Sequence, residues 1–294
     1  MKTRDSSKNS PPTPPKPTAP YNPTPEERIA RIEAGLASLG LQEVLRTLRE
    51  DLANPQADRN RLDWLWKLLE PQVRKRLEGR VERRIKDAKL PARKTFHDFD
   101  FHFQPTLDRD LILELATLRF LGQGRNVLLA GMSGTGKSHI AMAIALAACV
   151  ANRSVTYTTS ADMLANLNAC LADGTLTTTL KRYTRPELLV IDELGLEQVE
   201  RKSATRSGLL QKVLLPRHNH RLSTIVTSNI EWEAWGHYLD DQLGAAALLD
   251  RLIERSHVIV INGPSYREWL HKQDLENSRT AEKVGQEVAT TSAK

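Results

Sequence analysis

The eight residues 131–138, Gly-Met-Ser-Gly-Thr-Gly-Lys-Ser, constrain the fold more than any other part of the sequence. They fit the pattern G-x-x-x-x-G-K-[ST], in which backbone N–H groups wrap around a phosphate. Before them, residues 125–130 end in an apolar run that predicts a buried strand. After them, the alanine-rich run 140–151 predicts a buried helix. The pattern therefore lies between a strand and a helix, which is the context that a phosphate-binding loop requires.

Glycines let the backbone of such a loop approach a phosphate, and the N-terminus of the following helix adds partial positive charge. Lys137 is expected to reach the β- and γ-phosphates of ATP, and the Ser138 hydroxyl to hold Mg²⁺. The nucleotide-binding residues expected on this basis are Gly131, Met132, Ser133, Gly134, Thr135, Gly136, Lys137, Ser138 and His139. A chance glycine-rich turn is the alternative, and the flanking strand and helix disfavour it.

Composition predicts a globular protein without a membrane segment. The chain has 294 residues, 40% hydrophobic and 27% charged, which is enough for one large domain and one small one. Cys149 and Cys170 lie in expected core helices, which favours a reducing compartment without a disulfide framework. The longest apolar run is too short to span a bilayer, and the N-terminus lacks the apolar core of a signal peptide. We therefore expect a cytoplasmic protein.

Four domain segments are expected along the chain. Residues 1–25 hold eight of the fifteen prolines and almost nothing apolar, which predicts a disordered tail. A helical N-terminal domain follows over 26–92, then an α/β domain over 93–271 and a flexible tail over 272–294. The helices expected in the first domain are Glu26–Arg49, Arg61–Leu69 and Gln72–Lys89.

The last of these helices is strongly basic. Between Pro71 and Lys94, ten Lys or Arg residues stand against three acidic ones, a balance of +7. The whole chain carries +6, so the remainder is about neutral (6 − 7 = −1). Such a block is a candidate site for nucleic acid, with Arg80, Arg83 and Arg84 as contacts. A solvated helix face explains the same run, and charge alone favours that simpler interpretation.

Four further apolar runs predict buried strands separated by helix-length segments, which indicates a parallel sheet covered on both faces. These runs are Ser154–Thr158, Leu188–Ile191, Thr224–Thr227 and Val258–Ile261, and an amphipathic helix is expected over Asp110–Leu121. The second run ends in Asp192 and Glu193, which places two carboxylates at the ligand-binding edge of the sheet. Asp192 would hold magnesium through water, and Glu193 would polarise the attacking water.

Three more residues fit hydrolysis of a triphosphate. Asn229 ends the Thr224–Thr227 strand, where a neutral amide could position water. Arg251 and Arg267 could neutralise charge on the transferred phosphoryl group, one across a subunit boundary and one within the subunit. Taken singly, a turn-forming Asn and structural salt bridges explain these residues equally well.

Together these motifs resemble the AAA+ ATPases, within them the helicase loaders and transposition helpers, and most closely the IstB family, ATP-dependent helpers of IstA-type transposases. The resemblance covers roughly residues 30–270. It is carried by Trp235-Gly236, Ala245–Leu252, His257-Val258, Gly263-x-Ser-Tyr-Arg267, Asp98–Phe101 and Ala116–Phe120. It implies an AAA+ P-loop fold after a small all-α module.

The resemblance also implies roles for residues. Asn229 is then the sensor I residue, Arg251 an arginine finger acting on a neighbour's ATP, and Arg267 the sensor II arginine. The connector around Phe96–Phe101, Phe99 included, would border the adenine. Met132-Ser133 stands where such proteins often carry a proline. Neither side chain supplies a phosphate ligand, so we expect nucleotide binding to survive.

A protein of this family would form ATP-dependent oligomers that grip and deform duplex DNA and recruit or activate an IstA-type transposase. Further candidate DNA contacts are Lys181, Arg182, Arg201, Lys202 and Arg206, although ordinary surface exposure explains each of them as well. Three alternatives remain: a replicative helicase loader of the DnaC type, a P-loop kinase for a small metabolite, and a scaffold that binds ATP without turnover. The kinase explains neither the arginines nor the basic helix.

Overall fold

A computed structural model describes residues 24–53, 60–172, 174–195, 206–230, 234–239 and 241–275. Apart from Thr24 and Pro25, the predicted N-terminal tail lies outside these residues, as do Arg201 and Lys202. The chain divides into two compact units between Glu78 and Gly79. This division falls inside a helix, and the boundary expected near residue 92 stays a prediction.

The first unit is helical, as predicted, but its first helix is shorter than expected. α1 (Pro25–Leu39) begins with a capping box between Thr24 and Glu27, and it ends at Gly40 in the left-handed conformation, with φ 76°. A second helix, α2 (Gln42–Leu52), follows. The prediction of one helix over 26–49 was therefore wrong, because the left-handed Gly40 reverses the chain and lets Leu36 and Leu45 share one core.

The two helices predicted on either side of Pro71 form one helix, α3 (Asn60–Ala88). Proline usually breaks a helix because it lacks an N–H donor and its ring clashes with the preceding turn. Here Trp66 and Val73, on either side of the proline, both lie against Gly35 of α1. Packing against the same glycine holds both halves in one helix, an effect that local sequence does not reveal.

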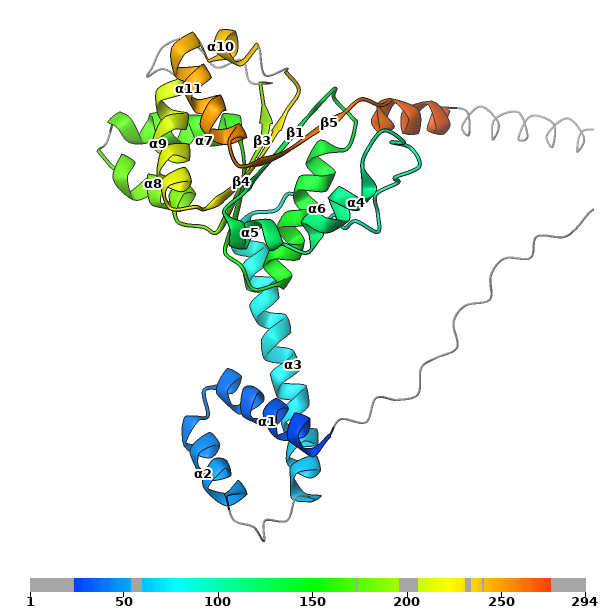
Figure 1. The fold of residues 1–294 in the computed structure, drawn as a ribbon, viewed down its shortest axis with the longest axis vertical. Coiled ribbons are helices and arrows are strands. Elements are labelled where there is room, and N and C mark those ends of the chain that lie inside the picture. The colour runs from blue at the N-terminus through cyan, green and yellow to red at the C-terminus, as the bar shows by residue number, and fades with distance from the viewer. Residues whose placement is uncertain are drawn as a thin grey trace, which may run out of the picture. The chain divides into compact units, whose positions relative to one another are not determined.

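The second unit contains a five-stranded sheet, and every strand pair in it is parallel, as predicted. Its order is β2-β3-β4-β1-β5. In Figure 1, α6 and α4 lie on one side of the labelled strands, and α7, α9 and α11 lie on the other. The strands are β1 (Asn126–Gly131), β2 (Val155–Thr159), β3 (Leu188–Leu194), β4 (Ser223–Ser228) and β5 (Ser256–Ile261). The helices are α4 (Arg109–Ala116), α5 (Arg119–Gln123), α6 (Lys137–Val150), α7 (Ser160–Ala172), α8 (Leu176–Thr184), α9 (Arg206–Asn219), α10 (Trp235–Tyr238) and α11 (Gln242–Ile253).

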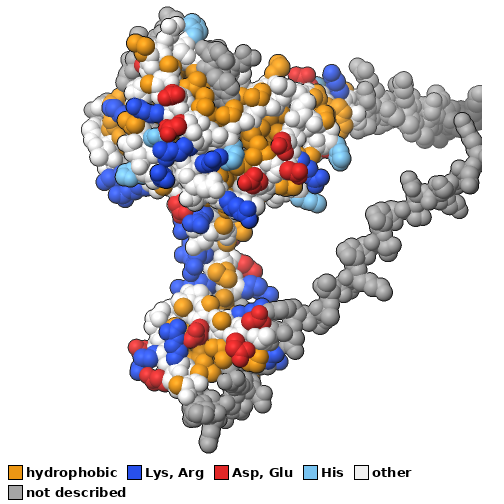
Figure 2. All heavy atoms as spheres, in the orientation of Figure 1, with side chains coloured by type: hydrophobic (Ala, Val, Ile, Leu, Met, Phe, Trp, Pro, Cys, Tyr) orange, Lys and Arg blue, Asp and Glu red, His pale blue; other side chains and the backbone are white. Residues whose placement is uncertain are grey.

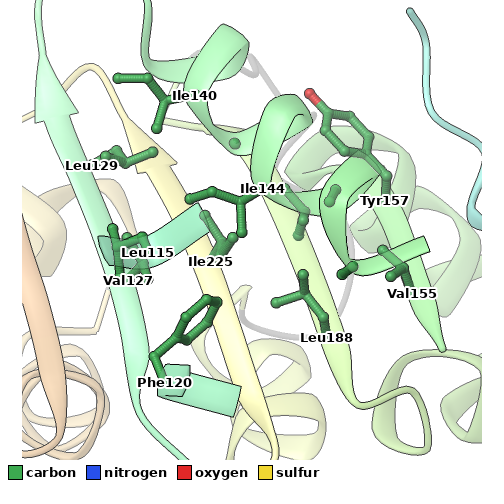
Figure 3. Packing of buried hydrophobic residues seen from close by; sticks show 14 of the residues in the cluster. Leu115, Phe120, Val127, Leu129, Ile140, Ile144, Val155, Tyr157, Leu188 and Ile225 are labelled. Carbon is green, nitrogen blue, oxygen red and sulfur yellow. The ribbon is translucent and has the colours of Figure 1, made fainter. Parts of the chain in front are cut away.

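Helices cover both faces of this sheet, and alternate residues of each strand supply the two cores. Val127 and Leu129 of β1 join a cluster with α4, α6 and the end of α3 (Figure 3). Leu128 between them joins the opposite cluster, with α7, α9 and α11. Because both faces are buried, the central strands are continuous apolar runs, and this is why they were predictable.

Two boundaries differ from the sequence-based prediction. The helix expected over 110–121 is interrupted at Leu118, which has φ 62°, and so forms α4 and α5. Residues 266–275 are helical, and this helix includes the first four residues of the flexible tail expected over 272–294. Among the helices that the structure describes, none combines the length and apolar character needed to cross a bilayer.

Candidate nucleotide-binding site

The predicted phosphate loop joins β1 to α6, and two of its glycines are required by close neighbours. Gly136 has φ 100° immediately before α6, and a Cβ there would lie 2.5 Å from the ring of Phe99. Gly134 has φ 81°, and a Cβ there would overlap the Ser265 hydroxyl. Side chains are excluded at both positions, so the loop backbone stays open to a ligand at the N-terminus of α6.

Lys137 is the first residue of α6 and is only 5% exposed. Its Nζ donates hydrogen bonds to the carbonyl oxygens of Gly131 and Met132, each over 2.7 Å. Burial lowers the pKa of Lys137 to about 8; the charge of Asp192 opposes this shift, and that of Arg267 adds to it. The ammonium group is thus costly to bury, and an anionic ligand beside it would relieve that cost.

Asp192 of β3 accepts hydrogen bonds from three hydroxyl groups on three different elements. The Ser138 Oγ of α6 lies 2.9 Å from Oδ1, which also accepts from Thr227 of β4. The Tyr157 hydroxyl of β2 donates to Oδ2. Every donor is an oxygen, the ligand type that magnesium prefers.

Magnesium is usually held by one or two carboxylates together with substrate phosphates and water. Ser138 and Asp192 fit this arrangement, as predicted for the metal-binding pair. Within the described ranges no three His, Cys, Asp or Glu side chains are grouped as an all-protein metal site would need. The residues present therefore suit a magnesium ion that arrives with a nucleotide.

Glu193 departs from the regular strand. It has φ 62°, and its backbone N–H donates to Thr227 Oγ1 over 2.9 Å. The pairing of β3 with β4 shifts register between Ile191 and Leu194. Successive strand residues normally point to opposite faces. This irregularity allows Glu193 to line the same cavity as the phosphate loop while its neighbour Asp192 contacts Ser138.

A cavity of about 460 Å³ brings most of the predicted site residues together. It is lined by Lys94, Asp98, Phe99, Asp100, Phe103, Gln104, residues 133–139, Met142, Glu193, Thr227, Asn229, Tyr266, Arg267 and Leu270. Gly131 and Met132 do not line it, and Met132 is 77% exposed. Asn229, Arg267 and Glu193 come from three separate segments of the chain, and all three line this cavity.

Arg251 lies elsewhere. It is exposed on α11 and lines a separate small cleft with Asn126 and His218. It does not line the cavity of its own chain. An arginine in this position would act on the ATP of a neighbouring subunit and not on that of its own chain. The finger role of Arg251 stays a prediction.

Residues before and after the α/β core hold the loop in place. Phe99 lies edge-on to His139, with 5.3 Å between ring centroids, and the His139 ring nitrogen Nε2 lies 2.8 Å from the Thr95 carbonyl oxygen. After β5, the Tyr266 N–H donates to the Gly134 carbonyl oxygen over 3.0 Å. The connector before α4 and the segment after β5 thus both line the cavity.

Tyr157 and Thr227 were not among the predicted site residues. Tyr157 stands in an apolar strand, so its residue type and position indicate core packing, and its ring does pack there. Thr227 was included only as part of a strand. The available signal was their place on β2 and β4, the two strands that flank β3, with Thr227 near the carboxyl end of its strand. Ligand-binding groups gather at that edge of a parallel sheet.

Several of the basic residues proposed for DNA make contacts within the chain. Arg84 donates to Asn152 Oδ1 over 3.3 Å, and Arg83 to the Gly79 carbonyl oxygen over 3.1 Å. Arg206 donates to the Tyr238 carbonyl oxygen over 2.8 Å. Arg80 is half-buried, whereas Lys181 and Arg182 are exposed on α8. Figure 2 shows Lys and Arg side chains interspersed with Asp and Glu side chains on the visible face of the molecule. DNA contact by any of these residues stays a prediction.

A phosphate loop between β1 and α6, with an acid pair at the end of β3, defines a P-loop nucleotide-binding protein. Comparison with known families makes the assignment specific. A family model described as IstB-like ATP binding protein matches residues 34–274, and the chain therefore belongs to this family. The family assignment confirms the resemblance noted in the sequence, and the parallel sheet with a phosphate loop between β1 and α6 is a P-loop fold, as that resemblance implied.

Individual relatives agree with this assignment. The ATP-binding protein predicted for insertion sequence IS21 of Pseudomonas aeruginosa is 35% identical over 208 residues, 71% of this chain and 77% of the relative. The ATP-binding protein predicted for insertion sequence IS232 of Bacillus thuringiensis is 34% identical over 206 residues, which cover 70% of this chain and 81% of the relative. The ATP-binding protein predicted in an insertion sequence of Mycobacterium tuberculosis is 33% identical over 233 residues, which cover 79% of this chain and 92% of the relative.

Solved structures are more distant. DnaI is 25% identical, covering 58% of this chain and 92% of its own, with a TM-score of 0.47. The DnaC helicase loader is 22% identical, covering 52% and 86%, with a TM-score of 0.44. The sequence relatives, and not these structures, therefore carry the family assignment.

Proposed function

We propose that this protein is a magnesium-dependent ATPase that assembles on duplex DNA and recruits or activates a partner transposase during DNA transposition. Support comes first from the family, whose members compared above are named as ATP-binding proteins of insertion sequences. The observation that carries the catalytic part is the shared cavity of the phosphate loop, Glu193, Asn229 and Arg267. Groups that bind phosphate and groups that can direct water face the same space.

Each residue has a distinct role in this proposal. The loop backbone and Lys137 bind the β- and γ-phosphates, and Ser138 and Asp192 hold magnesium. Magnesium, when bound, neutralises charge on the phosphate oxygens. Glu193 orients the attacking water and accepts its proton, and Asn229 helps to position that water. In the same cavity, Arg267 stabilises the charge of the transferred phosphoryl group.

Arg251 completes the site of a neighbouring subunit in this proposal. Its guanidinium is exposed on α11 and lies apart from the cavity of its own chain. An arginine supplied by a neighbour contributes on the order of 10³–10⁵ in rate in related phosphoryl-transfer enzymes. Hydrolysis would then depend on assembly, and the ATP-bound oligomer would be the form that grips DNA.

Duplex DNA would be bound mainly through phosphates. The +7 balance of residues 71–94 and the exposed Lys181 and Arg182 supply positive charge for such contacts. Binding should weaken with salt by a log–log slope of about −0.9 for each phosphate neutralised. Bending a short duplex costs about 1–6 kcal/mol, which many phosphate contacts could offset.

The decisive experiment compares the unaltered protein with Glu193→Gln. ATP hydrolysis by the unaltered protein should depend on magnesium and rise when duplex DNA is added. Glu193→Gln should bind ATP with unchanged affinity, hydrolyse it about 10²–10⁴-fold more slowly, and remain on DNA longer. Glu114→Gln, an exposed change outside the cavity lining, is the control. Equal hydrolysis rates for Glu193→Gln and the unaltered protein would contradict the role of Glu193.

A further inference from the structure

The carboxylate of Asp192 is almost completely enclosed, with 5% of the residue exposed. A buried carboxylate is stable only when donors satisfy its oxygens. Ser138 and Thr227 donate to Oδ1, and Tyr157 donates to Oδ2. The two oxygens therefore have different partners. Oδ1 accepts from Ser138, which follows the lysine of the phosphate loop, and Oδ2 accepts from Tyr157 of β2.

Tyr157 is suited to act as a fixed hydrogen-bond donor. The residue is 5% exposed, and its ring packs in the cluster that also contains Val155 and Leu188. Figure 3 shows the ring at the rim of this cluster, with its hydroxyl oxygen directed away from the apolar side chains. Burial raises the pKa of the Tyr157 hydroxyl, and the charge of Asp192 raises it further. The hydroxyl therefore keeps its proton at neutral pH and can only donate to the carboxylate.

We propose that Tyr157 is a positioning residue for the magnesium site, because its hydroxyl holds Oδ2 of Asp192 and thereby directs Oδ1 towards Ser138. This inference rests on the proposed function of that site. Without the tyrosine hydroxyl, Oδ2 would be left buried without this donor, and the carboxylate would turn or admit water. Groups that orient metal ligands in this way typically affect metal affinity by 10- to 100-fold.

Thr227 extends the same arrangement to the second acid. Its hydroxyl donates to Asp192 Oδ1 and accepts the hydrogen bond from the Glu193 N–H. One threonine therefore connects the carboxylate of Asp192 to the left-handed backbone of Glu193. The Tyr157 hydroxyl contacts only Asp192. Through Asp192 and Thr227 it belongs to a chain of hydrogen bonds that fixes the positions of both Asp192 and Glu193.

The test measures the affinity of the full-length chain for a fluorescent ATP analogue as magnesium is titrated. Tyr157→Phe keeps the ring and removes the hydroxyl. The magnesium concentration at half-maximal effect should rise about 10- to 100-fold, whereas affinity measured in EDTA should not change. Tyr183→Phe is the matched control, because Tyr183 is 1% exposed and its hydroxyl accepts from Asn166 over 2.9 Å. Its magnesium dependence should equal that of the unaltered protein.

An unchanged magnesium dependence in Tyr157→Phe would overturn the proposal, as would nucleotide binding by the unaltered protein that ignores magnesium. If Tyr157→Phe does not fold, Thr227→Val beside Thr227→Ser tests the same network, since only the valine removes the hydroxyl. Equal magnesium dependence of that pair would also overturn the proposal. The readout needs no hydrolysis. If the unaltered protein binds ATP together with magnesium but does not hydrolyse it, the proposed function is contradicted. The magnesium titration still measures the role of Tyr157 in that case.

Discussion

The backbone N–H of Tyr266 donates a hydrogen bond to the carbonyl oxygen of Gly134, with 3.0 Å between the two atoms. This contact joins the phosphate loop to the segment after β5, which carries Arg267. Ser265, on the same segment, occupies the space where Gly134 would otherwise carry a side chain. The position of the segment that carries Arg267 relative to the phosphate loop therefore depends partly on a glycine in the loop.

Gly134→Ala should impair nucleotide binding for two reasons. The residue has φ 81°, where a side chain costs roughly 1–2 kcal/mol, and the new methyl group would overlap Ser265. If that cost falls on the ATP-binding conformation, affinity drops about tenfold or more. Equilibrium titration with an ATP analogue measures the change.

The matched control is Gly79→Ala. Gly79 lies inside α3, and a Cβ there would meet no atom within 4 Å. That change should leave ATP affinity unaltered and stabilise the helix by about 0.5–1 kcal/mol. Unchanged affinity in Gly134→Ala would mean that the loop tolerates displacement of the segment holding Arg267.

ATP affinity should fall as pH rises from about 7 to 9. Without ligand, the pKa of Lys137 is lowered to about 8, first by burial. Below this pH the ammonium is charged and attracts phosphate; above it, binding must also take up a proton. Arg267→Ala removes a charge that lowers this pKa, so the fall should move to higher pH. Equilibrium titrations with an ATP analogue across this range measure the change, and a constant affinity in the unaltered protein would contradict the assignment.

Mixing two inactive variants should restore hydrolysis. Lys137→Ala loses phosphate binding, and Arg251→Ala loses the proposed finger, so each alone should be inactive. In a mixed oligomer, the intact loop of one variant can meet the intact arginine of the other. Steady-state ATPase assays of the mixture should exceed the sum of the separate samples. Arg255→Ala, which alters an arginine paired with Glu254 at 3.8 Å, should retain hydrolysis by itself.

The absence of rescue would be meaningful only if mixed oligomers form. Native mass spectrometry of differently tagged variants checks this directly. Mixed oligomers without recovered activity would contradict an arginine acting between subunits, because one type of interface contains both intact parts.

Arg217 is predicted to be important for stability and not for nucleotide binding. It is 1% exposed, and its guanidinium donates to the carbonyl oxygens of Tyr183 and Pro186 over 2.9 and 2.8 Å. It also donates to Thr224 Oγ1 over 3.0 Å, which connects α9 to β4. Arg217→Met would leave these acceptors buried without their donor.

The expected loss for Arg217→Met is about 3–5 kcal/mol of unfolding free energy, measured by urea denaturation. The exposed Arg185→Met should change it by less than about 0.5 kcal/mol. A loss equal to that of the Arg185 variant would show that water replaces the arginine without cost.

The local pattern was enough to predict the strand, loop and helix around residues 131–138, and the acids that end β3. Buried parallel strands are continuous apolar runs, and a phosphate loop needs its glycines and Lys137 at fixed spacing. The separation of Asn229 and Arg267 along the chain hid their proximity from pattern alone. Their roles came from the family resemblance, and their meeting in one cavity was observed only in the structure.

The sequence by itself determined where the five strands lie and which residues can bind phosphate, because these properties depend on neighbours within a few positions. Tertiary structure alone decided that α3 continues through Pro71, that Leu118 interrupts a helix, and that Tyr157 contacts Asp192. Such features depend on contacts between residues far apart in the chain. The packing free energy of those contacts outweighs the local conformational preference of the sequence, so local patterns do not predict them.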